Sequence, residues 1–195
     1  SPLSEFTVGQ LWVMVGEKNF LVSQVVGRFD IMEKMSQFEA LANSARVWEV
    51  RSKMPVKHLI EDACGGSGLA TSLEKMKGIR NIELLRKKRN EDKTQRVIDS
   101  SIYFALHKVY REVDGRLDEW VDQITSYPYA SHDDQVDATT QVLIYHRDNK
   151  KDPKEISNCQ LVPRKEFVET RDNFLLENNY GVNLKVSTIK GYFDD

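Results

Sequence analysis

Cysteines and long apolar runs are scarce in this sequence, and each scarcity excludes a class of protein. The 195 residues include two cysteines, Cys64 and Cys159, which lie far apart and outside any CxxC or Cys/His spacing. A disulfide framework and a structural zinc site are therefore both unexpected. No apolar run approaches the roughly 18 to 20 residues of a membrane span. We expect no membrane partner and a reduced, intracellular setting.

A phosphate-binding loop is missing as well. The stretch "GGSGLATS", residues 65–72, has the glycines of such a loop but lacks the GxxxxGK[ST] pattern. We therefore expect neither nucleotide binding nor an ATPase motor in these residues. The remaining composition, 40% hydrophobic and 30% charged, is ordinary for one well-buried globular domain.

The first third of the chain predicts a hairpin and a helix. Residues 6–15 and 19–29 are rich in β-branched and aromatic side chains and flank "GEK", which is typical of two antiparallel strands joined by a turn. Asp30, with Glu33 three residues later, predicts a capped helix start. Apolar residues at helical spacing continue that helix over 31–45.

The next elements alternate between strand and helix. We expect strands at 56–62 and 79–86 around a helix closed by Gly78, and this order implies parallel pairing. A short edge strand is expected at 107–113. Three further helices are predicted at Asp92–Leu106, Leu117–Thr125 and Asp133–Tyr145. The fold class is therefore α/β, a mixed sheet flanked by helices.

The character of the chain changes after His146. The stretch "HRDNKKDPKEI" is highly charged and contains Pro153, which is typical of a linker or an exposed bend. We expect one domain over residues 1–147, followed by a charged linker and a C-terminal extension over 148–195. The role of that extension is not readable from its residues.

Basic residues gather in one segment although the formal net charge is -2. Between Lys75 and Arg96 nine basic residues stand against three acidic ones. Such a stripe attracts phosphates. A charge run of this kind is also a common solvated surface, and the residues alone leave both interpretations open.

Acidic residues gather at two other places. Glu61 lies at the carboxyl end of a predicted strand, an edge where ligands bind in open α/β sheets. The stretch "SHDDQVDATTQVL", residues 131–143, opens the last predicted helix with Asp133, Asp134 and Asp137. Asp134 and Asp137 are three residues apart and therefore share a helix face.

Crowded carboxylates repel unless a positive group lies between them. That group is a metal ion, a basic side chain or the amides of a helix start. A helix cap explains one aspartate well and three poorly. A strand glutamate with a helix DxxD favours a hard divalent cation, Mg²⁺ or Mn²⁺, which binds carboxylates together with water and phosphate oxygens. Both interpretations stay open at this point.

The order of these motifs resembles a known family. The sequence runs "HLIEDACGGSGL", then Lys93 and Arg96 as KxxR, then "KVYRE", then "SHDDQVDATTQVL". This order resembles the C-terminal nuclease domain of the large terminase subunit of tailed phages, which has an RNase H-like fold. The opening "SPLSEFTVGQLW" and "FLVSQVVGRFD" are similar to the first hairpin of that family, so the resemblance spans residues 4–145. The last motif is its most specific part.

The resemblance implies a fold, an activity and a set of partners. The fold would be an RNase H-like mixed sheet of five or more strands flanked by helices. The activity would be two-metal cleavage of concatemeric viral DNA during genome packaging, with Mg²⁺ or Mn²⁺ as the cofactor. The partners would be double-stranded DNA, an N-terminal ATPase domain, the portal and the small terminase subunit. Such a protein would be encoded by a virus and act in the host cytoplasm.

The resemblance also assigns residues. Glu61, Asp134 and Asp137 would be catalytic metal ligands, and Asp133 would be a further ligand. Part of the basic segment would contact the DNA backbone without sequence choice. The residues in that part are Arg86, Lys87, Lys88, Arg89, Lys93 and Arg96.

One family position is not matched. The family places an aspartate on its first strand, upstream of the position matched here by Ser4, Glu5 and Phe6, and this sequence has none there. We therefore expect weak or no cleavage by these 195 residues alone.

Other functions stay open at this point. One is a catalytically impaired DNA-binding or assembly module of the packaging motor, and another is a relative of the RuvC-like resolvases. A third is an unrelated α/β protein whose acids bind a structural metal or cap helices.

Overall fold

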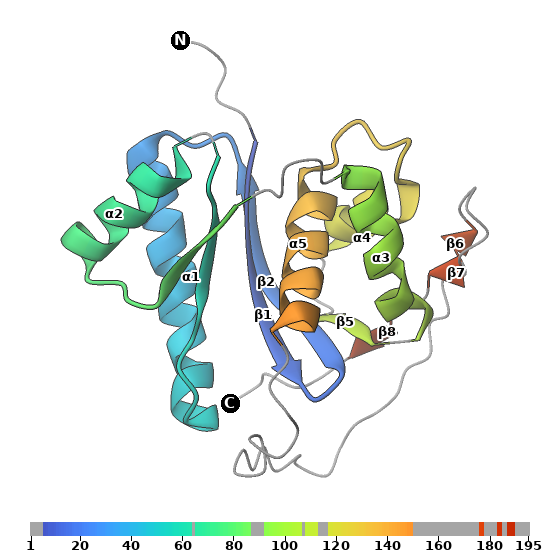
Figure 1. The fold of residues 1–195 in the computed structure, drawn as a ribbon, viewed down its shortest axis with the longest axis horizontal. Coiled ribbons are helices and arrows are strands. Elements are labelled where there is room, and N and C mark those ends of the chain that lie inside the picture. Colours follow the sequence, from blue (N-terminus) through green and yellow to red (C-terminus); the bar gives the residue numbers. More distant parts are fainter. Residues whose placement is uncertain are drawn as a thin grey trace. The chain divides into compact units, whose positions relative to one another are not determined.

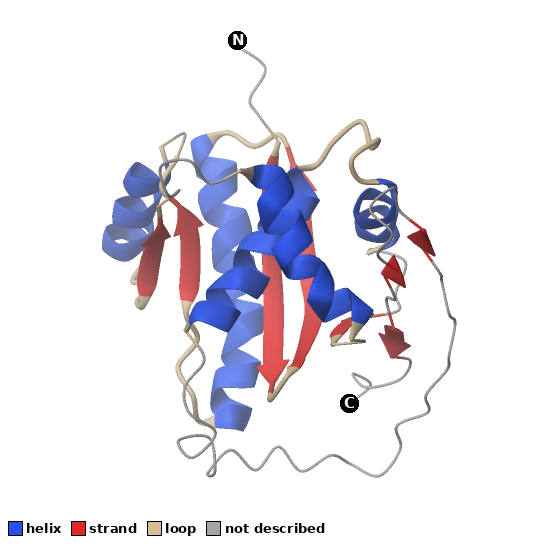
Figure 2. Cartoon of the chain, turned by 45° about the vertical axis from the view of Figure 1, so that its right-hand side comes forward, coloured by secondary structure: helices blue, strands red, loops and turns tan. Residues whose placement is uncertain are grey.

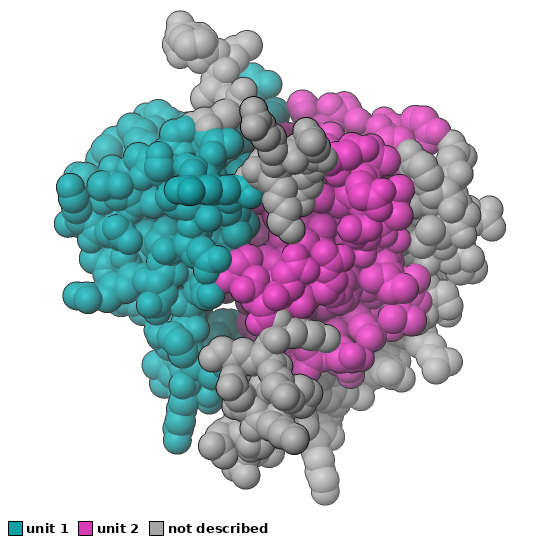
Figure 3. All heavy atoms as spheres, viewed as in Figure 1, with its two compact units in different colours: residues 1–9, 25–91, 159–161 teal, residues 10–24, 92–158, 162–195 magenta. Residues whose placement is uncertain are grey.

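The chain divides into two compact units. The computed structural model describes residues 6–63, 65–86, 92–106, 108–112 and 117–149, together with the backbone of three short strands, β6 (Leu176–Glu177), β7 (Asn183–Leu184) and β8 (Ser187–Ile189). Unit 1 holds residues 1–9, 25–91 and 159–161, and unit 2 holds residues 10–24, 92–158 and 162–195 (Figure 3). Of the predicted linker and C-terminal extension over 148–195, only residues 148 and 149 and these three short strands are described.

A long hairpin opens the described chain and contributes residues to both units. Its strands are β1 (Thr7–Val15) and β2 (Lys18–Gly27), which are neighbours in one sheet and form the two long arrows of Figure 2. The turn between them places Gly16 at a φ of 60°, a left-handed conformation that glycine adopts without steric cost. The predicted hairpin is confirmed.

The long helix of unit 1 begins where its cap was predicted. α1 (Ile31–Ser52) starts after Asp30, whose Oδ1 accepts a hydrogen bond from the Glu33 amide at 2.9 Å. Glu33 Oε2 in turn accepts from the Asp30 amide at 2.9 Å, which completes a capping box. The helix runs further than predicted, to Ser52, and ends at a left-handed Lys53.

Two short strands and a second helix complete unit 1. β3 (His58–Glu61) and β4 (Ile82–Leu85) pair in parallel, with Glu61 opposite Leu85, and α2 (Gly66–Lys77) connects them (Figure 1). The predicted parallel pairing is confirmed. The core of this unit is aliphatic, and its buried members are Met35, Ile60, Ala70, Leu73 and Ile79.

Unit 2 shows that the predicted edge strand is not at an edge. β5 (Val109–Glu112) pairs in parallel with β2 on one side and with β8 on the other. Its short length and its charges are typical of an edge strand. The charge of Arg111 is compensated, because its Nη2 lies 3.0 Å from Asp118 Oδ1. This ion pair lowers the cost of placing a charged residue in a strand that has neighbours on both sides.

The RNase H-like expectation is one mixed sheet of five or more strands, and the described strands do not form one continuous sheet. They form a four-stranded sheet, β1-β2-β5-β8, and two separate pairs, β3-β4 and β6-β7. The element types were therefore predicted better than their pairing. The coarser prediction of a mixed α/β fold is confirmed in the described residues.

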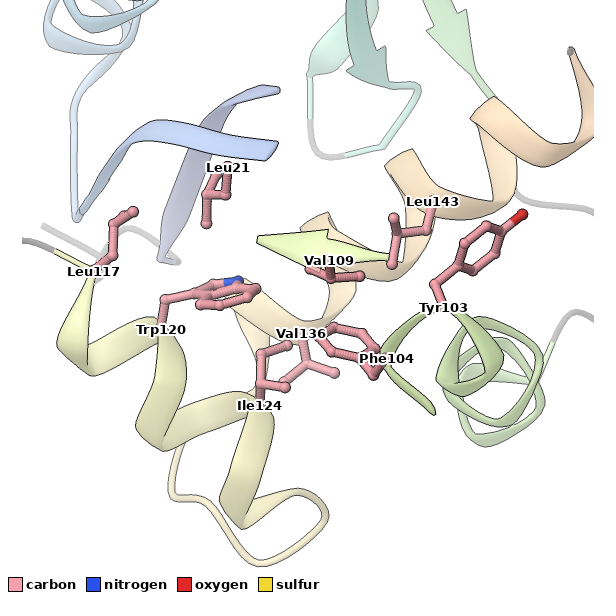
Figure 4. Close-up of a cluster of buried hydrophobic side chains, with 9 residues drawn as sticks. All are labelled: Leu21, Tyr103, Phe104, Val109, Leu117, Trp120, Ile124, Val136 and Leu143. Carbon is pink, nitrogen blue, oxygen red and sulfur yellow. The ribbon is translucent and has the colours of Figure 1, made fainter. Parts of the chain in front are cut away.

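Three helices cover the core of unit 2. They are α3 (Lys93–Ala105), α4 (Asp118–Ser126) and α5 (Asp134–Asp148), and each begins within one residue of its predicted start. Nine buried apolar side chains from the strands and these helices form the core cluster drawn in Figure 4, and Trp120 is fully buried among them. Among the described residues, no helix is both long and apolar enough to span a membrane.

Candidate functional site

The start of α5 carries three aspartates, one at the N-cap position and two in the first turn. Asp133 is the N-cap residue, and its side chain makes no capping hydrogen bond. Asp134 and Asp137 follow in the first turn, and the Asp137 amide bonds the Asp133 carbonyl at 2.9 Å. The cap interpretation therefore does not account for the position of Asp133.

Basic side chains from the start of α3 offset these aspartates. The Lys93 Nζ lies 2.5 Å from Asp133 Oδ2 and 2.8 Å from Asp137 Oδ2, so one ammonium bridges two carboxylates. The Arg96 Nη2 donates to Asp137 Oδ1 at 2.6 Å. We call Lys93, Arg96, Asp133 and Asp137 the α3–α5 charge cluster. The positive group that crowded carboxylates need is thus supplied by the chain itself.

Burial differs sharply within the charge cluster. The Arg96 side chain is 6% exposed, whereas those of Asp137, Lys93 and Asp133 are 25%, 29% and 48% exposed. Arg96 was predicted to contact DNA, and so little of its side chain is exposed that we reassign it to holding Asp137. Burial alone would lower the pKa of Lys93, but the hydrogen bonds and charges of Asp133 and Asp137 together raise that pKa above its usual value.

Asp134 lies in the same turn but outside this network. Its side chain is partly exposed, and none of the described basic side chains forms an ion pair with it. Asp134 therefore keeps its carboxylate oxygens available for a ligand, whereas both oxygens of Asp137 are already in contact with cations.

The opposite side of α5 is held by neutral polar groups that sequence reasoning missed. Gln135 is buried, accepts a hydrogen bond from Gln24 at 2.9 Å and donates one to Glu119 at 3.1 Å. Thr139 Oγ1, also buried, accepts from Trp120 Nε1 at 2.8 Å. The sequence did contain a sign of these buried polar residues, because Gln135 and Thr139 are four residues apart and lie between apolar residues of the same helix. These bonds fix the rotation of α5 and so direct its aspartates toward α3.

The strand end that carries the predicted carboxylate of unit 1 is fixed by backbone packing. Glu61 ends β3 as predicted, and Gly66 lies so close that a Cβ added there would overlap the Glu61 carbonyl oxygen. Gly65 adopts a φ of 91°, which favours glycine. The tight turn from β3 into α2 therefore depends on two glycines, and this turn fixes the end of the strand.

The remaining predicted basic residues are only partly described. Arg86 is 81% exposed, and its Nε lies 3.3 Å from Asp62 Oδ2, so the guanidinium remains accessible to a phosphate. Lys87, Lys88 and Arg89 lie outside the described residues, as does Cys64. The predicted DNA contacts of Lys87, Lys88 and Arg89 stay predictions.

The donor chemistry of the charge cluster suits a hard cation held in an open site. Asp133 and Asp137 converge on one positive charge, that of Lys93, and both offer carboxylate oxygens. Mg²⁺ is commonly bound by one or two carboxylates together with waters and substrate phosphates. Across the described residues, no three His, Cys, Asp or Glu side chains are grouped to hold a metal ion. The fit is therefore to two carboxylates completed by water and substrate.

Comparison with known proteins does not assign this site. No protein-family model matches the chain, and no curated protein matches it.

Proposed function

We propose that this chain is a metal-dependent DNA endonuclease domain of RNase H-like type, which cuts concatemeric viral DNA during genome packaging. The proposal rests on the resemblance of its motifs to the terminase nuclease domain. One structural observation supports it. Two aspartates of the HDDxxDA motif, Asp133 and Asp137, are gathered around a single positive charge at the start of α5.

The observation matters because carboxylates share a cation only where the protein holds them together. An ammonium and a divalent ion make the same basic demand, namely oxygen ligands of negative charge at close range. A site that gathers two carboxylates around Lys93 thus has the ligand type that Mg²⁺ or Mn²⁺ requires. Asp134 follows Asp133 in the sequence and lies outside the ion-pair network.

The proposed roles of the residues follow from their positions. Asp133 and Asp137 would hold the metal where Lys93 now lies, with Asp134 beside them as the sequence resemblance implies, and Glu61 is assigned to the same centre by that resemblance alone. Two bound divalent ions would supply an activated water and stabilise the leaving oxygen. Arg86, which is largely exposed, would hold a backbone phosphate.

Metal-induced stabilisation tests the proposal without depending on the rate of cleavage. A ligand that binds the folded state raises stability by about 1.4 kcal/mol at ten times its Kd. Millimolar Mn²⁺ should therefore raise the melting temperature by a few degrees, on the order of 3 °C for a chain of this size. Asp134→Ala should shrink that shift, and Asp62→Asn should retain it, because Asp62 faces Arg86. The absence of a shift in the parent protein would contradict the proposal.

DNA binding separates the proposal from an unrelated α/β protein. Phosphate contacts release counterions, so the affinity should fall steeply and about equally for different sequences as salt increases. Replacing Lys87, Lys88 and Arg89 together with alanine should flatten that salt dependence. An unchanged slope would return these residues to the solvated-surface interpretation.

A second function is favoured by one specific observation. Lys93 and Arg96 already neutralise Asp133 and Asp137, so the cluster is stable as an internal ion-pair network. A DNA-binding or assembly module that has lost catalysis would retain such a network. It would bind DNA with the same salt dependence but show neither Mn²⁺-induced stabilisation nor Mn²⁺-supported cleavage of plasmid DNA.

A further inference from the structure

We propose that Lys93 and Arg96 have different roles in the charge cluster. Lys93 is an internal cation that occupies the metal position and leaves it when a divalent ion binds. Arg96 is a positioning residue that keeps Asp137 in place throughout. This inference rests on the proposed metal site, and it adds a competition between the chain's own cation and the metal.

The contacts of the two side chains differ in a way that supports this division. The Lys93 ammonium touches Oδ2 of both Asp133 and Asp137, which is the bridging position that a shared cation takes. Arg96 touches the other oxygen of Asp137, Oδ1. Departure of Lys93 would therefore free one oxygen on each aspartate, while the Arg96 contact keeps Asp137 in the same orientation.

Burial and side-chain chemistry point the same way. Arg96 is 6% exposed, so moving its guanidinium would break its contact with Asp137 Oδ1 and open a packed region. Lys93 is 29% exposed, and its ammonium is compact, strongly hydrated and carried on a flexible stem. The ammonium of Lys93 can move into water at far lower cost than the guanidinium of Arg96.

The position of Lys93 on its helix also favours release. Lys93 is the first residue of α3, directly after the N-cap Asp92, whose Oδ1 accepts from the Thr94 amide at 3.0 Å. A cation at a helix N-terminus opposes the helix dipole. Lys93 is therefore held in this position by its contacts with Asp133 and Asp137. A divalent ion that neutralises these two carboxylates removes the attraction that holds Lys93. The released ammonium then adds a positive charge to the surface beside the site.

Binding of Mn²⁺ to matched variants tests the division of roles. Free Mn²⁺ is measured by electron paramagnetic resonance at constant pH, with the parent, Lys93→Met, Arg96→Met and Arg96→Lys. Lys93→Met removes the competitor and should bind Mn²⁺ about tenfold more tightly. Arg96→Met and Arg96→Lys should bind it more weakly, because Asp137 loses its orientation. Lys77→Met removes a lysine paired with Glu39 in unit 1 and should change nothing.

The signs of the changes distinguish the inference from simple electrostatics. Lys93→Met and Arg96→Met each remove one positive charge from the same cluster, so general electrostatics predicts tighter binding for both. The inference predicts opposite changes. If Arg96→Met fails to fold, as its circular dichroism would show, Arg96→Lys retains the charge and provides the comparison.

Each outcome bears on a distinct claim. Binding by the parent together with tighter binding by Lys93→Met supports the exchange, whereas binding that appears only in Lys93→Met overturns it, because Lys93 then blocks the site instead of leaving it. Equal or weaker binding by Lys93→Met, with Mn²⁺ bound by the parent, overturns the exchange and leaves the proposed metal site standing. No binding by the parent or by Lys93→Met overturns the metal site and the exchange together. Tightening of similar size in Arg96→Met overturns the positioning role of Arg96.

Discussion

The two places where the sequence predicts functional carboxylates are built by opposite means. At the end of β3, the backbone of Glu61 is fixed by close packing, because Gly66 lies against its carbonyl oxygen in a turn that tolerates no Cβ. At the start of α5, Asp137 is fixed by charge, because Lys93 and Arg96 contact its two oxygens.

This difference shows which substitutions should matter in each unit. Where backbone packing fixes the end of the strand that carries the carboxylate, the sensitive position is a residue without a side chain. Where charge holds it, the sensitive positions are the partners, and the neighbouring carboxylate that lacks a partner can be replaced freely. Stability measurements on matched pairs of variants can therefore test the comparison directly.

The largest effect is expected at Gly66. In Gly66→Ala the added Cβ meets the Glu61 carbonyl, a backbone atom that cannot rotate away, so the free energy of unfolding should fall by about 3 kcal/mol. Gly68→Ala is the matched control, because no atom lies within 4 Å of its added Cβ. Alanine in a helix is favoured over glycine by about 0.5 to 1 kcal/mol, so this control should be stabilised. Equal effects in urea unfolding would contradict the backbone account.

The next effect is expected at Asp137, on the charged side of the comparison. Asp137→Ala leaves the buried Arg96 without its carboxylate and should cost about 2 kcal/mol, less than a fully buried pair because Asp137 is partly exposed. Asp134→Ala removes a carboxylate outside the ion-pair network. It should change stability by less than about 0.5 kcal/mol, and relief of repulsion favours a small gain. Thermal melts without metal compare the stabilities of the two variants. A larger loss of stability in Asp134→Ala than in Asp137→Ala would contradict the view that charge partners hold Asp137.

The smallest effect concerns the strand that ends at Glu61. Burial lowers the pKa of His58, and the charge of Glu49 opposes this only in part. The unfolded chain therefore binds a proton at this histidine more readily than the folded chain does. The stability due to neutral His58 is complete above the unfolded pKa, about 6.5, and is lost as the pH falls through that value toward the folded pKa.

A pH series checks this prediction. The free energy of unfolding is measured between pH 8 and pH 5 for the parent and for His58→Gln, which retains a polar side chain and does not titrate. The decline toward pH 5 should be shallower in the variant. Identical slopes would show that His58 does not couple the folding of unit 1 to pH.

Local features of the fold were predictable because their causes are local. The capping box of Asp30 and Glu33 joins residues three apart, and α2 closes at the predicted Gly78. The strand-helix-strand order around α2 predicted the parallel pair because few connections of that length allow anything else. The crowding of aspartates likewise predicted that a positive group must be close to them.

Non-local features could not be predicted from the same patterns. The contact of Arg96 with Asp137 joins residues 41 apart in the chain, and the KxxR spacing gives no indication of which acids its members face. The burial of Gln135 depends on partners from β2 and α4. The central place of β5 depends on strands that precede and follow it by many residues. In each case tertiary packing determines the contact, the burial or the strand order. The local residues are compatible with more than one arrangement.

The central claim is that the α5 aspartates form a cation site in which a metal replaces Lys93. Anomalous diffraction from crystals grown with Mn²⁺ tests it most directly. The account predicts manganese bound to carboxylate oxygens of Asp133 and Asp137, in the position that the Lys93 ammonium leaves. Crystals that show no manganese at these oxygens, with Lys93 still bridging the two aspartates, would contradict it.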